Sequence, residues 1–136
     1  MPSTTQIVIK AENKLGTLAG VAAVLAREGV NIKAFSAPDV QGEGSLRILV
    51  ADLDRARIAL KQEKIRFSEE TALILSLENK PGALSEVAEL LKQAKINITC
   101  GYCTPSREGR RAMVVLTVAN PDKALEVLRG HSLDEF

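Results

Sequence analysis

The sequence predicts an α+β protein built from two consecutive copies of one small module. Two observations carry this prediction. The 136-residue chain repeats itself at a spacing of 66 residues. Within each half, short apolar runs that are typical of strands alternate with the apolar periodicity of amphipathic helices. We therefore expect two domains, the first over residues 1–68 and the second over residues 69–136.

The repeat is clearest after the first predicted strand of each copy. Residues 12–18 read Glu-Asn-Lys-Leu-Gly-Thr-Leu, and residues 78–84 read Glu-Asn-Lys-Pro-Gly-Ala-Leu. Of the 21 positions from 12 to 32, ten are identical to their counterparts without a gap. Agreement of this length indicates a duplication rather than chance.

Each copy is expected to begin with a strand and a helix. Runs rich in Ile, Val and Leu predict strands at 6–11 and 71–77. The Asn-Lys-x-Gly loop follows, and its Gly permits a turn that a Cβ would oppose. Apolar residues then recur at i, i+3, i+4 and i+7, which predicts a helix with one apolar stripe. The stripes consist of Leu18, Val21, Ala22 and Leu25, and of Leu84, Val87, Ala88 and Leu91.

Two more strands follow in each copy. Extended runs are predicted at 30–36 and 45–50 in the first copy, and at 96–102 and 111–118 in the second. A polar, Gly-containing turn separates the two runs in both copies. Such a turn between two extended runs is typical of a hairpin.

A second helix and a last strand would complete the module. Asp54 and the pair Pro121-Asp122 are typical of helix starts, with Asp as a candidate N-cap. Residues 65–67 are expected to form the fourth strand of the first copy. The second copy has only residues 132–136 for this purpose, so its last strand is expected to be short or incomplete. This order predicts two tandem ferredoxin-like βαββαβ modules, with helices packed on antiparallel sheets.

Composition indicates a soluble globular protein. Hydrophobic residues make up 46% of the chain and charged residues 26%, and the formal net charge is +1. Such a charge provides no field that would attract nucleic acid or an anionic membrane. The first residues do not resemble a signal peptide, and no apolar run approaches the roughly 18 residues that span a bilayer. With two cysteines, the chain is expected to be cytoplasmic, with no nucleic-acid or membrane partner.

The Asn-Lys-x-Gly loop between a strand and an amphipathic helix, with an Asn-Ile pair opening the next strand, resembles the signature of ACT domains. The resemblance covers nearly the whole chain, twice. The second copy has the common Asn-x-Pro-Gly form, whereas the first has Leu15 where Pro is usual. The resemblance implies binding of an amino acid or similar effector where two domains meet, and regulation of a metabolic enzyme. The family also includes free-standing tandem copies with no attached enzyme.

The resemblance also implies which residues contact a ligand. In the first copy they are Asn13, Leu15, Gly16, Thr17, Leu18, Asn31 and Ile32. In the second copy they are Asn79, Pro81, Gly82, Ala83, Leu84, Asn97 and Ile98. A helix N-terminus suits a carboxylate, and an Asn side chain can both donate and accept hydrogen bonds. The alternative is that Asn13 and Asn79 only fix their own turns.

Other chemistry is less well supported by the sequence. Cys100 and Cys103 form a C-x-x-C, but they lie on a predicted strand, where positions i and i+3 point to opposite faces. No second Cys pair or nearby His completes a metal site. Arg107, Arg110 and Arg111 are interpreted as a solvated hairpin tip, although they could meet an anionic ligand. The lone His131 is expected to be a surface residue.

Two other classes that share this element order are excluded by composition. RNA-recognition modules stack bases on aromatic side chains of the sheet, and only 3% of this chain is aromatic. A small acylphosphatase-like enzyme would need an Arg in the loop after the first strand, where Lys14 and Lys80 are the cations. We therefore expect no enzymatic activity and no cofactor or metal.

The sequence-based hypothesis is a regulatory protein that binds an amino acid or related carboxylate where ACT domains meet. Ligand binding would order this interface and alter contact with a metabolic enzyme. A homodimer is expected, because domains this small leave sheet faces to be covered. The alternative is a structural or regulatory subunit that binds a partner enzyme and no ligand.

Overall fold

The computed structural model describes residues 3–12, 16–40, 43–105 and 108–129. The chain divides into two compact units. The N-terminal unit is Thr5–Glu70, and the C-terminal unit is Thr71–Phe136 together with Met1–Thr4. The repeat places a module boundary between residues 68 and 69, which stays a prediction. No helix in the described residues combines the length and the apolar character needed to cross a membrane.

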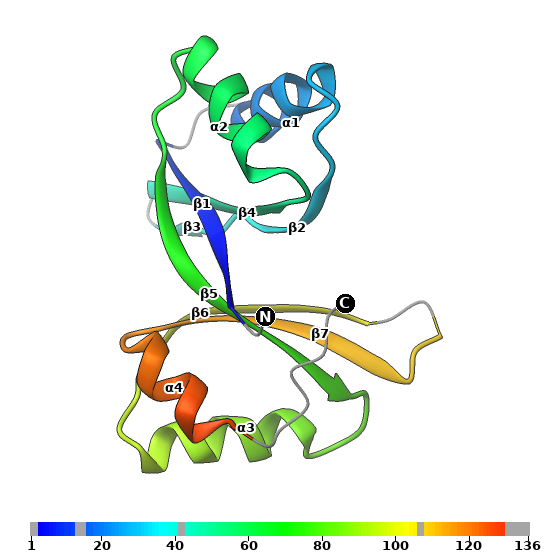
Figure 1. Cartoon of the computed structure of the whole chain (residues 1–136), viewed down its shortest axis with the longest axis vertical. Coiled ribbons are helices and arrows are strands. Elements are labelled where there is room, and N and C mark those ends of the chain that lie inside the picture. The colour runs from blue at the N-terminus through cyan, green and yellow to red at the C-terminus, as the bar shows by residue number, and fades with distance from the viewer. Residues whose placement is uncertain (1–2, 13–15, 41–42, 106–107, 130–136) are drawn as a thin grey trace. The chain divides into compact units, whose positions relative to one another are not determined.

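The N-terminal unit has two helices on one face of an antiparallel sheet (Figure 1). Its elements are β1 (Ser3–Glu12), α1 (Thr17–Arg27), β2 (Ile32–Ser36), β3 (Asp39–Val40), β4 (Glu43–Val50) and α2 (Leu53–Gln62). The strand order is β2-β4-β1, and the two-residue strand β3, which the sequence did not predict, pairs with β4. Ile7 lies opposite Ile48, and Ile9 lies opposite Leu46. This register directs both apolar pairs into one core.

The C-terminal unit repeats this arrangement. Its elements are β5 (Ser68–Glu78), α3 (Ala83–Gln93), β6 (Ile98–Pro105), β7 (Arg111–Val118) and α4 (Pro121–Val127). The strand order is β5-β7-β6, with antiparallel pairing throughout. The last strand expected at 132–136 lies outside the described residues. The predicted fold class, a tandem ferredoxin-like α+β arrangement, is confirmed.

One predicted strand is wrong. Residues 65–67 are irregular, and the extended chain begins at Ser68 and continues as β5. The physical reason lies at the end of α2, where Lys64 has a φ of 56° and the Ile65 N–H donates to the Leu60 carbonyl at 2.9 Å. Ile65 and Phe67 then pack against the core of the N-terminal unit. The apolar character of this segment therefore reflects core packing without strand geometry.

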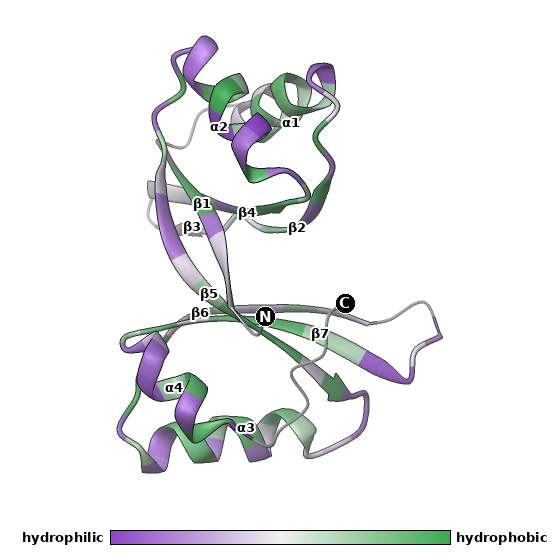
Figure 2. Cartoon of the chain, in the orientation of Figure 1, coloured by the Kyte–Doolittle hydropathy of each residue, from purple (hydrophilic) through white to green (hydrophobic). Residues whose placement is uncertain are grey.

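Both cores are built from the predicted helical stripes. Val21 and Leu25 of α1, and Val87 and Leu91 of α3, are almost fully buried against the strands of their own unit. Figure 2 shows apolar and polar residues mixed along each helix, as expected of amphipathic helices. Burial of such side chains is the main favourable contribution to folding.

Charged residues hold the start of β5 in the N-terminal unit. Glu70 accepts hydrogen bonds at 2.8 Å from the Arg47 Nε and from the amide of Gln6, which is fully buried. The neighbouring Glu69 pairs with Arg57 of α2. Successive strand residues point to opposite faces of the sheet. Glu69 and Glu70 therefore make their contacts on opposite faces of this segment. These contacts agree with a division between the two units after Glu70.

Candidate functional site

The helices that follow the repeated loops begin differently from the other two. Asp52 and Asn120 cap α2 and α4, and each side chain accepts a hydrogen bond from the N–H three residues later. The prediction of Asp54 and Asp122 as N-caps is wrong, because Asp52 and Asn120 take this role and both predicted residues lie in the first turns of their helices. By contrast, the N-cap residues of α1 and α3 are Gly16 and Gly82, which have no side chain with which to cap. The N-cap residue of these two helices therefore provides no side-chain acceptor for the first N–H groups of the helix.

The two glycines adopt the backbone conformation that the sequence predicts for them. Gly16 has a φ of 87° and Gly82 a φ of 91°, both in the left-handed region. In this region a Cβ is unfavourable. The turn brings the chain from the end of a strand to the start of a helix.

The ligand positions implied for the first copy are only partly described. Asn13 and Leu15 lie outside the described residues. Gly16, Thr17 and Leu18 form the start of α1, where Leu18 is 39% exposed. Asn31 and Ile32 lie at the start of β2, and the Asn31 carbonyl accepts a hydrogen bond from Ala51 at 2.9 Å.

The matching positions of the second copy are all described. Pro81, Gly82, Ala83 and Leu84 lead into α3, and Leu84 is 54% exposed. Asn97 is exposed, and its carbonyl accepts from the N–H of Ala119 at 3.1 Å. Ile98 opens β6 and packs against the core of the unit.

Asn79 ties its loop to the turn between β6 and β7. Its side-chain Nδ2 donates to the Gly109 carbonyl at 2.8 Å, and its backbone N–H donates to the Arg110 carbonyl at 2.8 Å. The alternative interpretation had this side chain fixing its own turn. Instead, the amide fixes the distance between two segments that are 30 residues apart.

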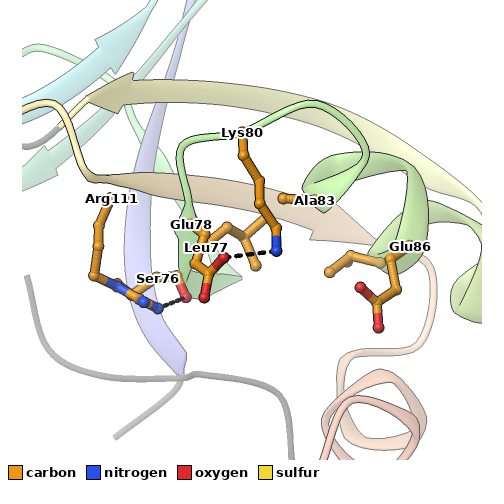
Figure 3. A pocket seen from close by; sticks show the side chains of 8 residues that line it. Ser76, Leu77, Glu78, Lys80, Ala83, Glu86 and Arg111 are labelled. Carbon is orange, nitrogen blue, oxygen red and sulfur yellow. Dashed lines mark hydrogen bonds and ion pairs between the residues drawn. The ribbon is translucent and has the colours of Figure 1, made fainter.

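A cleft of about 200 Å³ lies beside this loop in the C-terminal unit (Figure 3). Its apolar lining comes from β5 and α3, from residues Leu77, Ala83 and Val87. Its polar lining consists of Ser76, Glu78, Lys80, Glu86 and Arg111. Among the implied ligand positions that the structure describes, only Ala83 lines this cleft. The polar residues of the lining are therefore not among those that the sequence-based site prediction names.

Arg111 belongs to the cleft and not to a solvated hairpin tip, which corrects the interpretation of this residue. Its Nε donates to the Ser76 Oγ at 2.7 Å, and its Nη2 donates to the Ser76 carbonyl at 2.6 Å. Arg111 is half-buried and Ser76 is 3% exposed. The register of β5 and β7, which places Arg111 opposite Glu78, explains this position. Arg107 lies outside the described residues.

Glu78 and Lys80 form an exposed ion pair at the edge of the cleft. The Lys80 Nζ lies 2.8 Å from the Glu78 Oε2. The hydrogen bond from Lys80, followed by the charges of Lys80 and Arg111, lowers the pKa of the Glu78 carboxyl below its usual value. The same pair raises the pKa of Lys80. Both charges are therefore maintained at neutral pH.

The lowered pKa of Glu78 predicts a contribution to stability at acidic pH. A carboxyl whose folded pKa lies below its unfolded pKa of about 4.3 stabilises the fold above that pH, and the stabilisation is lost as the pH falls through the folded value. We expect Glu78→Gln to reduce the acid-induced loss of stability, measured by urea unfolding across this range. Lys80→Gln should reduce the acid-induced loss in the same way. In 1 M salt the difference between each variant and the wild type should become smaller, because salt screens an exposed ion pair. A Glu78→Gln profile parallel to that of the wild type would contradict this expectation.

The two cysteines lie on β6, as predicted. Both are free cysteines, and Cys103 is exposed. Among the described residues, no group of three or more His, Cys, Asp and Glu side chains is placed to hold a metal ion. His131 lies outside the described residues.

Both units contain a strand, a turn at a glycine N-cap and a helix, in that order. A family model described as ACT domain pair matches residues 3–135. The chain belongs to the ACT domain family. A comparison with curated proteins gives no match.

Solved structures share the fold of this ACT domain pair. A protein of Bacteroides thetaiotaomicron is 34% identical, with a TM-score of 0.86, over 94% of this chain and 88% of that chain. The ligand-free regulatory subunit of aspartate kinase from Thermus thermophilus is 16% identical, with a TM-score of 0.64, over 91% and 89%. The corresponding subunit from Thermus flavus is also 16% identical, with a TM-score of 0.61, over 95% and 94%. The last two similarities are at the level of the fold.

Proposed function

We propose that this ACT domain pair is a cytoplasmic regulatory protein that binds a small amino acid or related carboxylate and thereby controls a metabolic enzyme. In this proposal it has no catalytic activity, and it binds neither nucleic acid nor membranes. The observation that carries the proposal is the cleft beside the start of α3, which has charges of both signs in its lining.

The chemistry of this region suits an amino acid. A carboxylate is stabilised at a helix N-terminus by N–H groups and by the helix dipole, and Gly82 leaves that end of α3 without a side-chain cap. Arg111 provides a guanidinium, which pairs well with carboxylates. The carboxylates of Glu78 and Glu86 can accept hydrogen bonds from an ammonium group.

Regulation would follow from a difference in affinity between two states of the protein. A ligand that binds one arrangement of the loop more tightly shifts the population toward it, by no more than its differential affinity. Regulatory subunits of aspartate kinase share this fold, and we propose a comparable role here with a partner enzyme.

We further propose that the protein works as a homodimer. Leu18 and Leu84, at equivalent positions at the starts of α1 and α3, expose 39% and 54% of their surface. Apolar side chains next to the proposed ligand loops would be covered if these regions met a second copy. A sizing experiment at micromolar concentration should give the mass of two chains, and a monomer would contradict this part of the proposal.

A thermal-shift screen against the amino acids at millimolar concentration tests ligand binding. A ligand that binds only the folded state stabilises it by about 2.7 kcal/mol at 100 times its Kd, which raises the Tm by several degrees. We expect a selective shift for one amino acid or a few related ones, with sodium chloride at equal ionic strength as the control. Asn79→Ala should reduce that shift, because the loop would lose its contact with Gly109. A panel without any selective shift would contradict ligand binding and favour a subunit that binds only protein.

A further inference from the structure

Each unit has one strand at an edge of its sheet. β2 is the last strand in the order β2-β4-β1, and β6 is the last strand in the order β5-β7-β6. An edge strand presents backbone N–H and C=O groups that can pair with another chain, and charged side chains commonly protect such an edge. The eight residues of β6 include no charged side chain. This edge is therefore suited to pairing with a further strand.

The two edges carry a large and a small residue at the same position of the module. Phe35 of β2 lies opposite Ile48, and Gly101 of β6 lies opposite Leu116. Both opposite residues belong to the buried core of their own unit. Phe35 and Gly101 therefore lie on the face of the sheet that the helices cover. They are separated by the repeat spacing of 66 residues.

Neither residue is typical of an isolated edge. Phe35 exposes 51% of its surface. A glycine within a strand provides no side chain for packing and often marks a place where another backbone approaches closely. A Cβ at Gly101 would lie 3.1 Å from the Leu116 Cδ2, so a core leucine borders the space beside this glycine. The first copy thus has an aromatic ring that is half uncovered, and the second copy has an edge position without a side chain.

An antiparallel pairing of β2 with the β6 of another chain brings the two positions together. Around a local two-fold axis, equivalent residues of equivalent strands lie opposite each other. Directly opposite residues share a face of the sheet, with Cβ atoms about 4.5–5.5 Å apart. The Phe35 ring can then cover Gly101, and an aromatic residue across from an edge glycine is known to stabilise a sheet. In the same register Ala34 lies across from Tyr102, which again combines a small and a large side chain.

Pairings between like edges fit less well. Two β2 strands would place two Phe35 rings at one position, and two β6 strands would place two glycines there and leave a gap. A large residue opposite a small one fills the space between facing positions. Among the described residues, β2 pairs with β4 and β6 pairs with β7. The complementary edge therefore comes from a second copy of this chain.

We propose that β2 of one chain pairs antiparallel with β6 of a second copy, with Phe35 opposite Gly101, and that two chains make this pairing twice. The inference rests on the proposed homodimer and deepens it, because it assigns the strands, the register and the residues of the contact. It requires no ligand.

Cross-linking tests the register of the pairing. Ser36 lies across from Cys100 in this arrangement, and both side chains are half-buried. A chain with Ser36→Cys and Cys103→Ser, treated with a short bismaleimide, should give a covalent dimer on a denaturing gel. Mass spectrometry should find the link between residues 36 and 100 of different chains. The absence of a link between chains, or a 36–100 link within one chain, would overturn the pairing.

Two control chains exclude pairing between like edges. The first has Ser36→Cys with both Cys100→Ser and Cys103→Ser, and the second has Cys103→Ser alone. Each then carries a thiol on one edge only, so both should remain single chains on the denaturing gel. A 36–36 link in the first control would indicate pairing of two β2 strands. A 100–100 link in the second would indicate pairing of two β6 strands, and either result would overturn the proposal.

Substitutions test the contact between the large and the small residue. Phe35→Ala should raise the Kd of the dimer about tenfold or more, because buried aromatic residues dominate the affinity of interfaces. Ile58→Ala is the matched control, since Ile58 lies on α2 and is 58% exposed. It should leave the Kd unchanged. Sedimentation velocity over a dilution series measures these constants.

Gly101→Val provides the other half of the comparison. It should weaken the dimer, because the added side chain occupies the space of the Phe35 ring. Within the unit, the nearest atom to the added Cβ is the Leu116 Cδ2, at the end of a flexible side chain. The double variant with Phe35→Ala pairs two side chains of moderate size, so its Kd should be lower than the product of the single effects predicts. Effects that simply multiply would show that the two positions do not meet.

The outcomes separate this inference from the proposed function. Urea unfolding identifies variants that do not fold, and the exposed position of Phe35 provides a test even where Gly101→Val unfolds. A wild-type dimer that gives no 36–100 link and keeps its Kd in Phe35→Ala would overturn the edge pairing and leave the homodimer intact. A wild type that is a monomer at micromolar concentration would overturn both. Ligand binding is decided separately by the thermal-shift screen.

Discussion

Leu91→Ala should lower the free energy of unfolding by about 2–5 kcal/mol, the range for a buried leucine whose removal leaves a cavity. Leu91 is fully buried in the core of the C-terminal unit, between α3 and its sheet. Leu84→Ala, on the same helix, should lower it by about 1 kcal/mol or less, because this side chain is 54% exposed. Urea unfolding followed by circular dichroism measures both values.

The repeat provides a second pair for the same comparison. In α1, Leu25 is fully buried and Leu18 is 39% exposed, at the positions that match Leu91 and Leu84. Leu25→Ala should therefore be much more destabilising than Leu18→Ala. Equal losses in either pair would show that the helix packs on its sheet with a different face from the one described here.

These helices also show what periodicity can and cannot predict. The i, i+3, i+4, i+7 pattern identifies the face that Val21, Leu25, Val87 and Leu91 bury. It places Leu18 and Leu84 on the same stripe, although both are substantially exposed. Periodicity gives the direction of a side chain around the helix axis. It does not give the length over which a neighbouring layer covers the helix.

Element ends depend on backbone geometry that residue type reveals only in part. Asp52 and Asp54 are both suitable N-caps by composition, and only the structure shows that Asp52 accepts the hydrogen bond from Arg55. The apolar residues of 65–67 resemble a strand, but the Ile65 N–H is used at the end of α2. Local pattern does not reveal which partner a backbone N–H will find.

The loop beside the candidate site could be predicted where the signal is local, whereas the side chains that line the cleft depend on strand register. The repeated loop predicts the turn at Gly82 and the start of α3, and both are present. Arg111 reaches the cleft because β7 pairs with β5, so that it lies opposite Glu78 and bonds to Ser76. The sequence carries one signal for this residue, the replacement of Ser45 by Arg at the equivalent position. Without the strand register, that difference could not be placed beside the loop.

Gly16→Ala and Gly20→Ala should have opposite effects on stability, although the two glycines are only four residues apart. Gly16 has a φ of 87°, and a left-handed conformation of an L-residue costs about 1–2 kcal/mol. Gly20 lies inside α1, where Ala is more favourable than Gly by about 0.5–1 kcal/mol. Gly16→Ala should therefore lower the free energy of unfolding, and Gly20→Ala should raise it.

The comparison of Gly16→Ala with Gly20→Ala isolates the effect of backbone conformation on stability, because neither added Cβ would meet a neighbouring atom. A Cβ added at either glycine would meet no atom within 4 Å beyond its chain neighbours and its own helix backbone, so neither substitution creates a steric clash. The Gly16 carbonyl accepts the hydrogen bond of Gly20 N–H at 2.8 Å, so both positions belong to the same helix start. Urea unfolding of the two variants and of the double variant, whose effects should partly cancel, measures the difference. If both substitutions stabilised the protein, the left-handed turn would not be what requires glycine at position 16, and the basis for its role in the loop would be lost.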